Sequence, residues 1–293
     1  MSGLDIELRD VTVDFKDTRA LDAATVRFPA NSITGLLGRN GSGKTTMLSS
    51  IASLLRPTWG EVRVDGRDPY EDEALMEQIC LIRESGDVLT EEKLTVTLEF
   101  VASARPTWDQ AYAEELLDAF ELDPRKKPRK LSRGQRSAFG AVIGLASRAP
   151  VTMFDEVYLG MDAPSRRRFY DLLIADYVEH PRTIILSSHL IGEVEQLFEN
   201  VVVLDHGQVV LAEDADSLRE RGATVTGPAA RVDAATAGLR VLSEQSLGPT
   251  KQVTVLGTLD ADVRDRIRAA GLELDAVPIQ DLFIALTEKE ARR

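Results

Sequence analysis

The stretch Gly38-Arg39-Asn40-Gly41-Ser42-Gly43-Lys44-Thr45-Thr46 fits the spacing G-x-x-x-x-G-K-[ST] of a phosphate-binding loop. It follows an apolar run, residues 32–37, and precedes a segment with helical spacing, residues 45–55, that ends before Pro57. Glycines let backbone N–H groups turn toward a phosphate, and the new helix presents its positive N-terminus to the same anion. The loop therefore predicts a nucleotide site, in which Lys44 reaches the outer phosphates and the Thr45 hydroxyl holds Mg²⁺.

Composition narrows the class of partner. The 293 residues are 28% charged and 43% hydrophobic, which is ordinary for a globular chain with a substantial core. A formal charge of −13 argues against general affinity for nucleic acid or anionic lipid. The run at residues 125–130 is one candidate for a local basic patch, although such runs are usually solvated loops. We expect no nucleic-acid partner.

Two features predict the compartment. The single cysteine, Cys80, lies in an apolar run and is most simply a core residue. Residues 1–5 lack the features of a secretory signal, and no uninterrupted apolar run approaches 18 residues. We expect a cytoplasmic chain whose membrane role, if any, comes through a partner.

Residue patterns predict an α/β core. Alternating or wholly apolar segments predict strands at residues 6–15, 25–28, 32–37, 61–64, 151–154, 183–186 and 201–204. Helical segments separate the later strands, which implies a parallel sheet covered on both faces. From about residue 75 to 150 the spacing is mainly helical, apart from the apolar stretch 79–82, and indicates a helical insertion.

The C-terminal part has a pattern of its own. A polar stretch near residues 213–222 predicts the last core helix and a linker, so we place the domains at 1–221 and 222–293. The predicted order after it is strand 223–226, helix 229–237, strands 239–245 and 252–256, helix 262–270, strand 273–277 and a final helix from Asp281. This β-α-β-β-α-β order predicts a small α+β, ferredoxin-like domain. The alternative is a loosely packed tail.

A second acidic feature follows the strand at 151–154. Asp155 and Glu156 come where the strand ends, and parallel strands carry such residues to the edge that also holds the phosphate loop. Asp155 suits the Mg²⁺ shell, and Glu156 can polarise a water molecule. An acidic turn after a buried strand is the alternative.

Further motifs resemble one ATPase family in kind, order and spacing. They are Leu131-Ser132-Arg133-Gly134-Gln135, similar to the LSGGQ signature, Leu159-Gly160-Met161-Asp162, similar to the D-loop, Ser187-Ser188-His189, similar to the switch histidine, and Phe15, placed to stack on adenine. Over about residues 1–220 the chain resembles the ATP-binding subunit of an ABC transporter, with a P-loop NTPase core. Alone, Phe15 could be a core residue and His189 a helix cap.

The resemblance implies a shared site. Two subunits meet head to tail, and each ATP lies between residues 38–46 of one and the signature Ser132, Arg133, Gly134 and Gln135 of the other, with Asp162 nearby. Glu156 and His189 would hold the attacking water and the γ-phosphate geometry. Dimer closure and reopening would then move a separate transmembrane subunit.

Three residues depart from the family's pattern. Arg133 stands where the signature usually has glycine. Glu84, in the run 81–84, stands where a glutamine usually contacts the metal and the membrane subunit, and Val157 replaces a proline. Arg133 could point away or weaken one composite site, and Glu84 could still bind metal.

The resulting prediction is an ATP- and Mg²⁺-dependent ATPase subunit, peripheral on the inner face of the cell membrane. Its partners would be a separately encoded transmembrane permease and a second ABC ATPase subunit, in a homo- or heterodimer. The single cassette and the C-terminal domain resemble bacterial multidrug or antibiotic exporters. The alternatives are an ABC-type ATPase acting outside transport and a catalytically weak subunit of a heterodimer.

Overall fold

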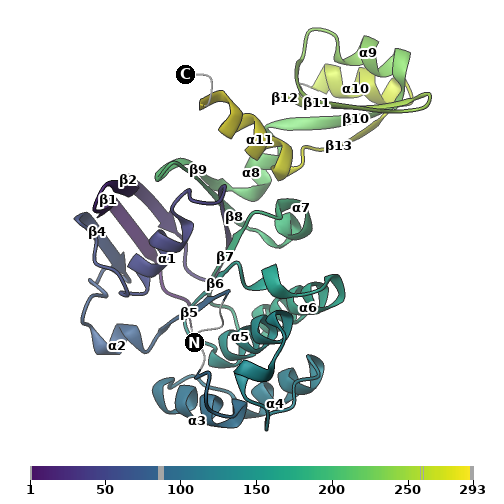
Figure 1. Cartoon of the computed structure of the whole chain (residues 1–293). Helices are drawn as coiled ribbons and strands as arrows, with labels where there is room; N and C mark the ends of the chain where they lie inside the picture. Colours follow the sequence, from purple (N-terminus) through teal and green to yellow (C-terminus); the bar gives the residue numbers. More distant parts are fainter. Residues whose placement is uncertain (1, 85–88, 258, 260, 291–293) are drawn as a thin grey trace. The chain divides into compact units, whose positions relative to one another are not determined.

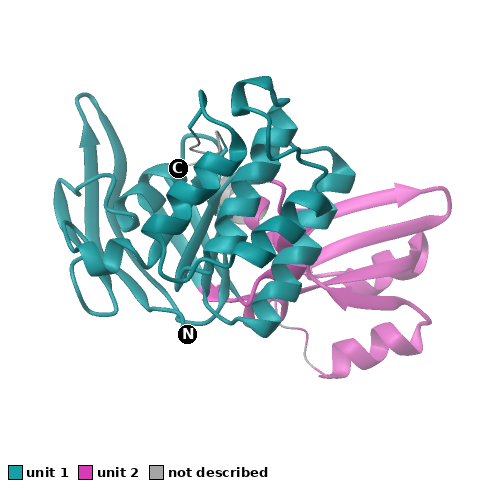
Figure 2. Cartoon of the chain, turned by 90° about the horizontal axis from the view of Figure 1, so that it is seen from below, with its two compact units in different colours: residues 1–189, 200–212 teal, residues 190–199, 213–293 magenta. Residues whose placement is uncertain are grey.

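The computed structural model describes residues 2–84, 89–257, 259 and 261–290, with the side chains of 285–290 excepted. Contacts divide the chain into two compact units (Figures 1 and 2). The first unit comprises residues 1–189 and 200–212, and the second comprises residues 190–199 and 213–293. The second unit therefore includes a ten-residue segment from the middle of the sequence, which directly follows His189.

A six-stranded sheet organises the first unit. In spatial order it contains β5 (Ile79–Arg83), β6 (Val151–Asp155), β7 (Thr183–Ser188), β3 (Ile33–Leu37), β8 (Asn200–Asp205) and β9 (Gln208–Asp214). The pairs from β5 to β8 are parallel, and every residue of β3, β6 and β7 is buried. The predicted parallel sheet with two covered faces is confirmed.

The register of this sheet brings motif residues together. Leu37 at the end of β3 pairs with Ser188 of β7, and Asp155 at the end of β6 pairs with Ser187. The carboxyl ends of three strands therefore share one edge, directly before the phosphate loop, the acidic pair and the histidine.

A second, antiparallel sheet has the order β2-β1-β4. Its strands are β1 (Ile6–Phe15), β2 (Thr18–Phe28) and β4 (Trp59–Val64). The turn after β4 places both Asp65 (φ 51°) and Gly66 (φ 74°) in the left-handed region that tight turns require. One hydrophobic core joins residues of both sheets with Met47, Leu48 and Ile51, which are fully buried.

The helices of the first unit are α1 (Lys44–Ile51), α2 (Glu73–Met76), α3 (Leu94–Ala104), α4 (Gln110–Ala119), α5 (Arg133–Ser147) and α6 (Ala163–Glu179). Helix α1 ends earlier than predicted, and Ser53 just beyond it has a left-handed φ of 58°. The range 75–150 also holds β5, with the buried Cys80, so its helical part begins at α3. Within the described residues, no helix has the length and apolar character needed to cross a membrane.

The second unit is a folded domain with its own core. It contains α7 (Ile191–Val194), α8 (Ala215–Arg219), β10 (Gly222–Pro228), α9 (Ala229–Thr236), β11 (Arg240–Leu247), β12 (Thr250–Leu256), α10 (Ala261–Ala269), β13 (Glu273–Ala276) and α11 (Ile279–Glu290). Its antiparallel sheet has the order β11-β12-β10-β13. Val225, Val232, Val255 and Ile267 are fully buried in its core, so the loosely packed tail is excluded and the predicted element order is confirmed.

Candidate active site

The phosphate loop joins β3 to α1 as its sequence predicts. Gly41 (φ 80°) and Gly43 (φ 108°) adopt left-handed conformations, and a Cβ atom on Gly43 would lie 2.5 Å from the carbonyl oxygen of Ala20. The buried Ser42 Oγ has no hydrogen-bond partner among the described residues. A tight loop with a spare hydroxyl donor and a helix N-terminus fits a phosphate group.

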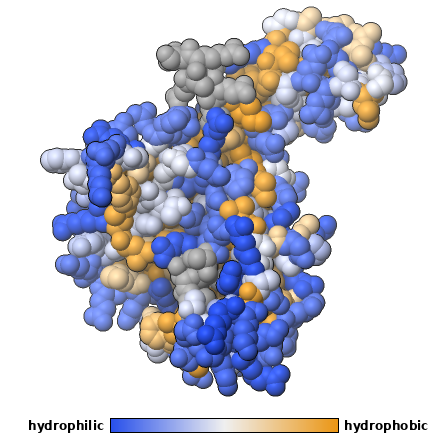
Figure 3. Space-filling model, viewed as in Figure 1, coloured by the Kyte–Doolittle hydropathy of each residue, from blue (hydrophilic) through white to orange (hydrophobic). Residues whose placement is uncertain are grey.

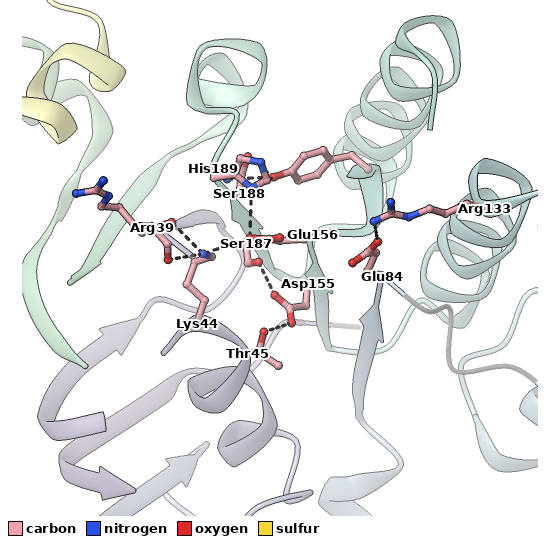
Figure 4. Close-up of polar contacts among 12 residues, drawn as sticks. Arg39, Lys44, Thr45, Glu84, Arg133, Asp155, Glu156, Ser187, Ser188 and His189 are labelled. Carbon is pink, nitrogen blue, oxygen red and sulfur yellow. Dashed lines mark hydrogen bonds and ion pairs between the residues drawn. The ribbon is translucent and has the colours of Figure 1, made fainter. Parts of the chain in front are cut away.

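Lys44 lies folded back over this loop, with only 5% of its side chain exposed. Its Nζ donates to the carbonyl oxygens of Gly38 at 2.9 Å and Arg39 at 3.2 Å (Figure 4). The same ammonium group lies 3.2 Å from Glu156 Oε1. The guanidinium of Arg39 points away from Lys44. Lys44 therefore places a positive charge directly against the phosphate loop.

Asp155 is buried where β6 ends and accepts two hydroxyl hydrogen bonds. Thr45 Oγ1 donates to Oδ2 at 2.6 Å, and Ser187 Oγ donates to Oδ1 at 2.5 Å. The hydroxyl of Thr45 and the carboxylate of Asp155 offer adjacent oxygen ligands, which suit Mg²⁺ when phosphates and water complete its shell. The sequence indicates Ser187 only as part of a motif, because its pairing with Asp155 depends on strand register.

Glu156 and His189 meet beside Lys44. Glu156 has a left-handed φ of 51°, and its Oε1 lies 3.4 Å from His189 Nδ1. Tyr158, missed in the sequence, places its hydroxyl 3.1 Å from the same Nδ1. It lies in the 3-10 turn η2 (Val157–Gly160), just beyond the acidic pair. The site thus brings together an ammonium, a carboxylate, an imidazole and a phenol.

The signature segment begins helix α5. Ser132 Oγ accepts from the backbone N–H of Gln135 at 3.1 Å, and Gln135 Oε1 accepts from that of Ser132 at 3.2 Å, which forms a capping box. Gly134 packs against η2 so closely that a Cβ atom would lie 2.6 Å from the carbonyl oxygen of Gly160. The capping role of Ser132 and Gln135 is an addition to their predicted place in the signature.

The two unusual residues, Arg133 and Glu84, form an ion pair with each other (Figure 4). Glu84 directly follows β5, and the last residue of β5 pairs with Asp155. Glu84 is therefore near the end of β6, but its carboxylate points to Arg133. The sequence predicts Glu84 as a metal ligand, and in this structure its carboxylate pairs with the signature arginine.

Phe15 and Asp162 lie in surface positions. Phe15 ends β1 with 47% of its surface exposed, so its ring is open to stacking. Asp162 caps helix α6 by accepting from the backbone N–H of Ser165 at 2.9 Å. Hydrogen bonding from Ser165 lowers the pKa of the Asp162 carboxyl below its usual value of 3.8.

This fold and site define a P-loop ATPase. Residues 21–158 match the family model described as ABC transporter. The chain is 28% identical to the daunorubicin/doxorubicin resistance ATP-binding protein DrrA of Streptomyces peucetius, over 96% of this chain and 92% of that protein. It is 27% identical to the methionine import ATP-binding protein MetN of Rhizobium johnstonii, over 97% and 86%.

A solved structure of an ATP-binding subunit of an ABC transporter shares the fold, with a TM-score of 0.66, 24% identity and coverage of 73% of this chain and 91% of that one. The chain belongs to the ABC transporter family, as an ATP-binding subunit, and it is an ATPase.

Proposed function

We propose that this chain hydrolyses MgATP to drive export through a separately encoded transmembrane permease, at the inner face of the cell membrane. The observation that carries the proposal is the contact series Lys44–Glu156–His189 beside the Thr45–Asp155 pair, all at one sheet edge. Phosphoryl transfer to water needs charge stabilisation at the phosphates and a group that orients the water. In this series Lys44 can supply the charge stabilisation, and Glu156 with His189 can orient the water.

Each residue then has a role. Lys44 holds the outer phosphates, and releasing its carbonyl and carboxylate partners frees its charge for them. Glu156 accepts a hydrogen bond from the attacking water and polarises it. His189 holds the γ-phosphate in position relative to that water. Thr45 and Asp155 would hold Mg²⁺, which when bound neutralises charge on the β- and γ-phosphates.

We also propose that the working unit is a dimer of ATPase subunits. Ser132 and Arg133 are exposed at the start of α5, where a second subunit can reach them. The second subunit would present its bound ATP to residues 132–135 and Asp162 of this chain. Phe15 of this chain would stack on the adenine of the ATP bound at this chain's own phosphate loop. The division into an ATPase domain, 1–221, and a ferredoxin-like domain, 222–293, belongs to the same proposal, with the second domain regulating activity or contacting the other subunit.

The permease needs an apolar docking surface. The face in Figure 3 is mainly hydrophilic, with apolar side chains in small patches. Helix α3 exposes Val96 (36%) and Phe100 (61%), which are four residues apart and therefore lie on one helix face. Isolated exposed apolar residues are common, but a shared face on a short helix favours a protein partner. Export is favoured by the likeness to DrrA, which extends over both units.

The test of the catalytic proposal is Glu156→Gln in the full chain with its permease. We expect turnover to fall roughly 10²–10⁴-fold, the usual contribution of a general base, while ATP binding persists because Lys44 and the loop remain. Glu179→Gln, at the end of α6, is the matched control and should leave turnover unchanged. Unchanged turnover in Glu156→Gln would remove that residue from the role. The direction of transport is tested by two assays that should agree. Export predicts loss of a drug from whole cells and ATP-dependent uptake of the same drug into everted vesicles, whose cytoplasmic face is outward.

A further inference from the structure

The second unit contains a polar cavity of about 230 Å³, separate from the ATP site in the first unit. Its most buried lining residues are Thr224 of β10 and Thr254 of β12, which are 3% and 2% exposed and whose hydroxyl oxygens lie 3.2 Å apart. Eight of the ten lining side chains end in a hydroxyl, an amide or a carboxylate, and none is lysine, arginine or histidine.

The cavity lies on the face of the sheet that is turned away from the apolar core. Strand alternation sends Val253 and Val255 of β12 into the core and Thr254, between them, to the cavity. Val225 and Thr224 of β10 divide in the same way. A buried hydroxyl costs free energy unless it is hydrogen-bonded, whereas valine would pack without this cost. A buried sheet face built from hydroxyl groups therefore favours a role in binding over a role in packing.

Two carboxylates of this cavity each have one oxygen occupied and one left over. Ser243 Oγ and Thr254 Oγ1 both donate to Asp281 Oδ2, at 2.9 and 3.0 Å. Glu195 Oε2 accepts from the backbone N–H of Gln280 at 3.3 Å. Within the part of the chain that the structure describes, Asp281 Oδ1 and Glu195 Oε1 accept no hydrogen bond. The internal contacts thus hold both carboxylates and leave acceptors for a ligand.

The charge of the cavity identifies the class of ligand. Its lining residues bring two negative charges and no positive charge, so a cation would offset them and donate to the remaining oxygens. Among the described residues, no group of three or more His, Cys, Asp or Glu side chains can hold a metal ion. An ammonium group, with three donors, suits carboxylate and hydroxyl partners instead. We propose that this cavity binds a small organic cation, a hydroxylated primary amine.

The volume of the cavity restricts the ligand to a small molecule. A water molecule takes about 30 Å³ of liquid, so 230 Å³ corresponds to roughly eight non-hydrogen atoms. Short amino alcohols are of this size, and their hydroxyl groups complement the glutamine amides at Gln245 and Gln252. The proposal concerns binding alone, so it stands or falls independently of ATP hydrolysis and transport.

The probe is 2-amino-1,3-propanediol, and its neutral control is glycerol, in which a hydroxyl group replaces the amine. Methyl spectra of the full chain labelled at threonine report on Thr224 and Thr254, whose signals disappear in Thr224→Ser and Thr254→Ser. We expect saturable shifts of these two signals with the amine and about tenfold weaker binding of glycerol. Equal binding of glycerol, no saturable shift at these methyl groups, or displacement of the amine by equimolar Mg²⁺ overturns the proposal.

Two variants test the carboxylates. Asp281→Asn and Glu195→Gln each remove one charge but keep an oxygen for the internal hydrogen bonds, and we expect the affinity for the amine to fall about tenfold in each. The matched control is Asp262→Asn, which removes an exposed carboxylate from the first turn of α10 and should leave the affinity unchanged. Thermal unfolding checks each variant, and Glu195→Gln provides the test if Asp281→Asn does not fold. Unchanged affinity in either folded variant, or an equal fall in Asp262→Asn, overturns the proposal.

Discussion

The ion pair between Arg133 and Glu84 gives the most discriminating prediction, because Glu84 has two competing roles. If Glu84 is the counterion of Arg133, the effect of substituting Glu84 depends on whether Arg133 is present. As a magnesium ligand, it would act independently of Arg133. Substituting Arg133→Ala and Glu84→Gln, singly and together, separates the two roles through the coupling between them.

The expected changes in stability follow from the exposure of the two side chains and from the position of Arg133 at the start of α5. The side chains are 64% and 38% exposed, so the pair contributes about 0.2–1 kcal/mol. Arg133 also places a cation in the first turn of α5, which holds no acidic residue, and this costs about 0.3–1 kcal/mol. Arg133→Ala removes both terms, and we expect it to be nearly neutral. Glu84→Gln removes only the favourable term and should lower stability by up to about 1 kcal/mol, or roughly 2–4 °C in Tm for a domain of this size.

The assays are thermal unfolding and ATPase activity titrated with Mg²⁺. In the Arg133→Ala background, we expect Glu84→Gln to have no further effect on Tm, and the Mg²⁺ concentration for half-maximal activity to stay constant throughout. The exposed pair Arg129–Glu91, at 2.7 Å, serves as a control for general loss of surface charge. Additive Tm effects, or a weaker Mg²⁺ response in Glu84→Gln with and without Arg133, would refute the counterion role and restore the metal-ligand hypothesis.

Three further predictions concern the edges of the site. Thr45→Val removes the hydroxyl beside Asp155, and we expect a raised Mg²⁺ requirement in the ATPase assay, with thermal unfolding as the check on folding. Gly134→Ala forces α5 away from the carbonyl of Gly160, and we expect a loss of about 1–3 kcal/mol in chemical unfolding. The lowered pKa of Asp162 contributes stability above pH 3.8 that disappears as pH falls through the folded-state value. The unmodified chain should thus lose thermal stability below about pH 4 more steeply than Asp162→Asn, and parallel profiles would contradict this.

The sequence predicted the parts of the fold that depend on local pattern. The strands that precede Gly38 and Glu156 could be predicted because buried parallel strands have a distinctive apolar composition. The phosphate loop and the acidic pair were thereby placed at strand ends. Strand β9 was not predicted, since its residues include charged side chains and an exposed start. Helix α1 was predicted too long, because apolar spacing continues through Leu55 although the backbone turns at Ser53.

Side-chain partnerships were beyond the sequence. The approach of Tyr158 to His189 crosses from the turn after β6 to the end of β7, and only the register between those strands brings the two together. Likewise, the spacing between Glu84 and Arg133 contains no local signal of an ion pair. A motif identifies residues that have a role, whereas their resting partners depend on how distant segments pack.

The position of His189 gives the C-terminal unit a physical connection to the site. His189 is the last residue of its segment in the first unit, and the next ten residues belong to the second unit. There, Gly192 N–H donates to Gln280 Oε1 at 3.2 Å, and Gln280 N–H donates to Glu195 Oε2 at 3.3 Å. These hydrogen bonds join α11 to α7 and to Glu195, and the peptide chain leads from α7 back to His189. The segment that directly follows the proposed γ-phosphate contact is therefore held by hydrogen bonds within the second unit, which also contains the C-terminal sheet.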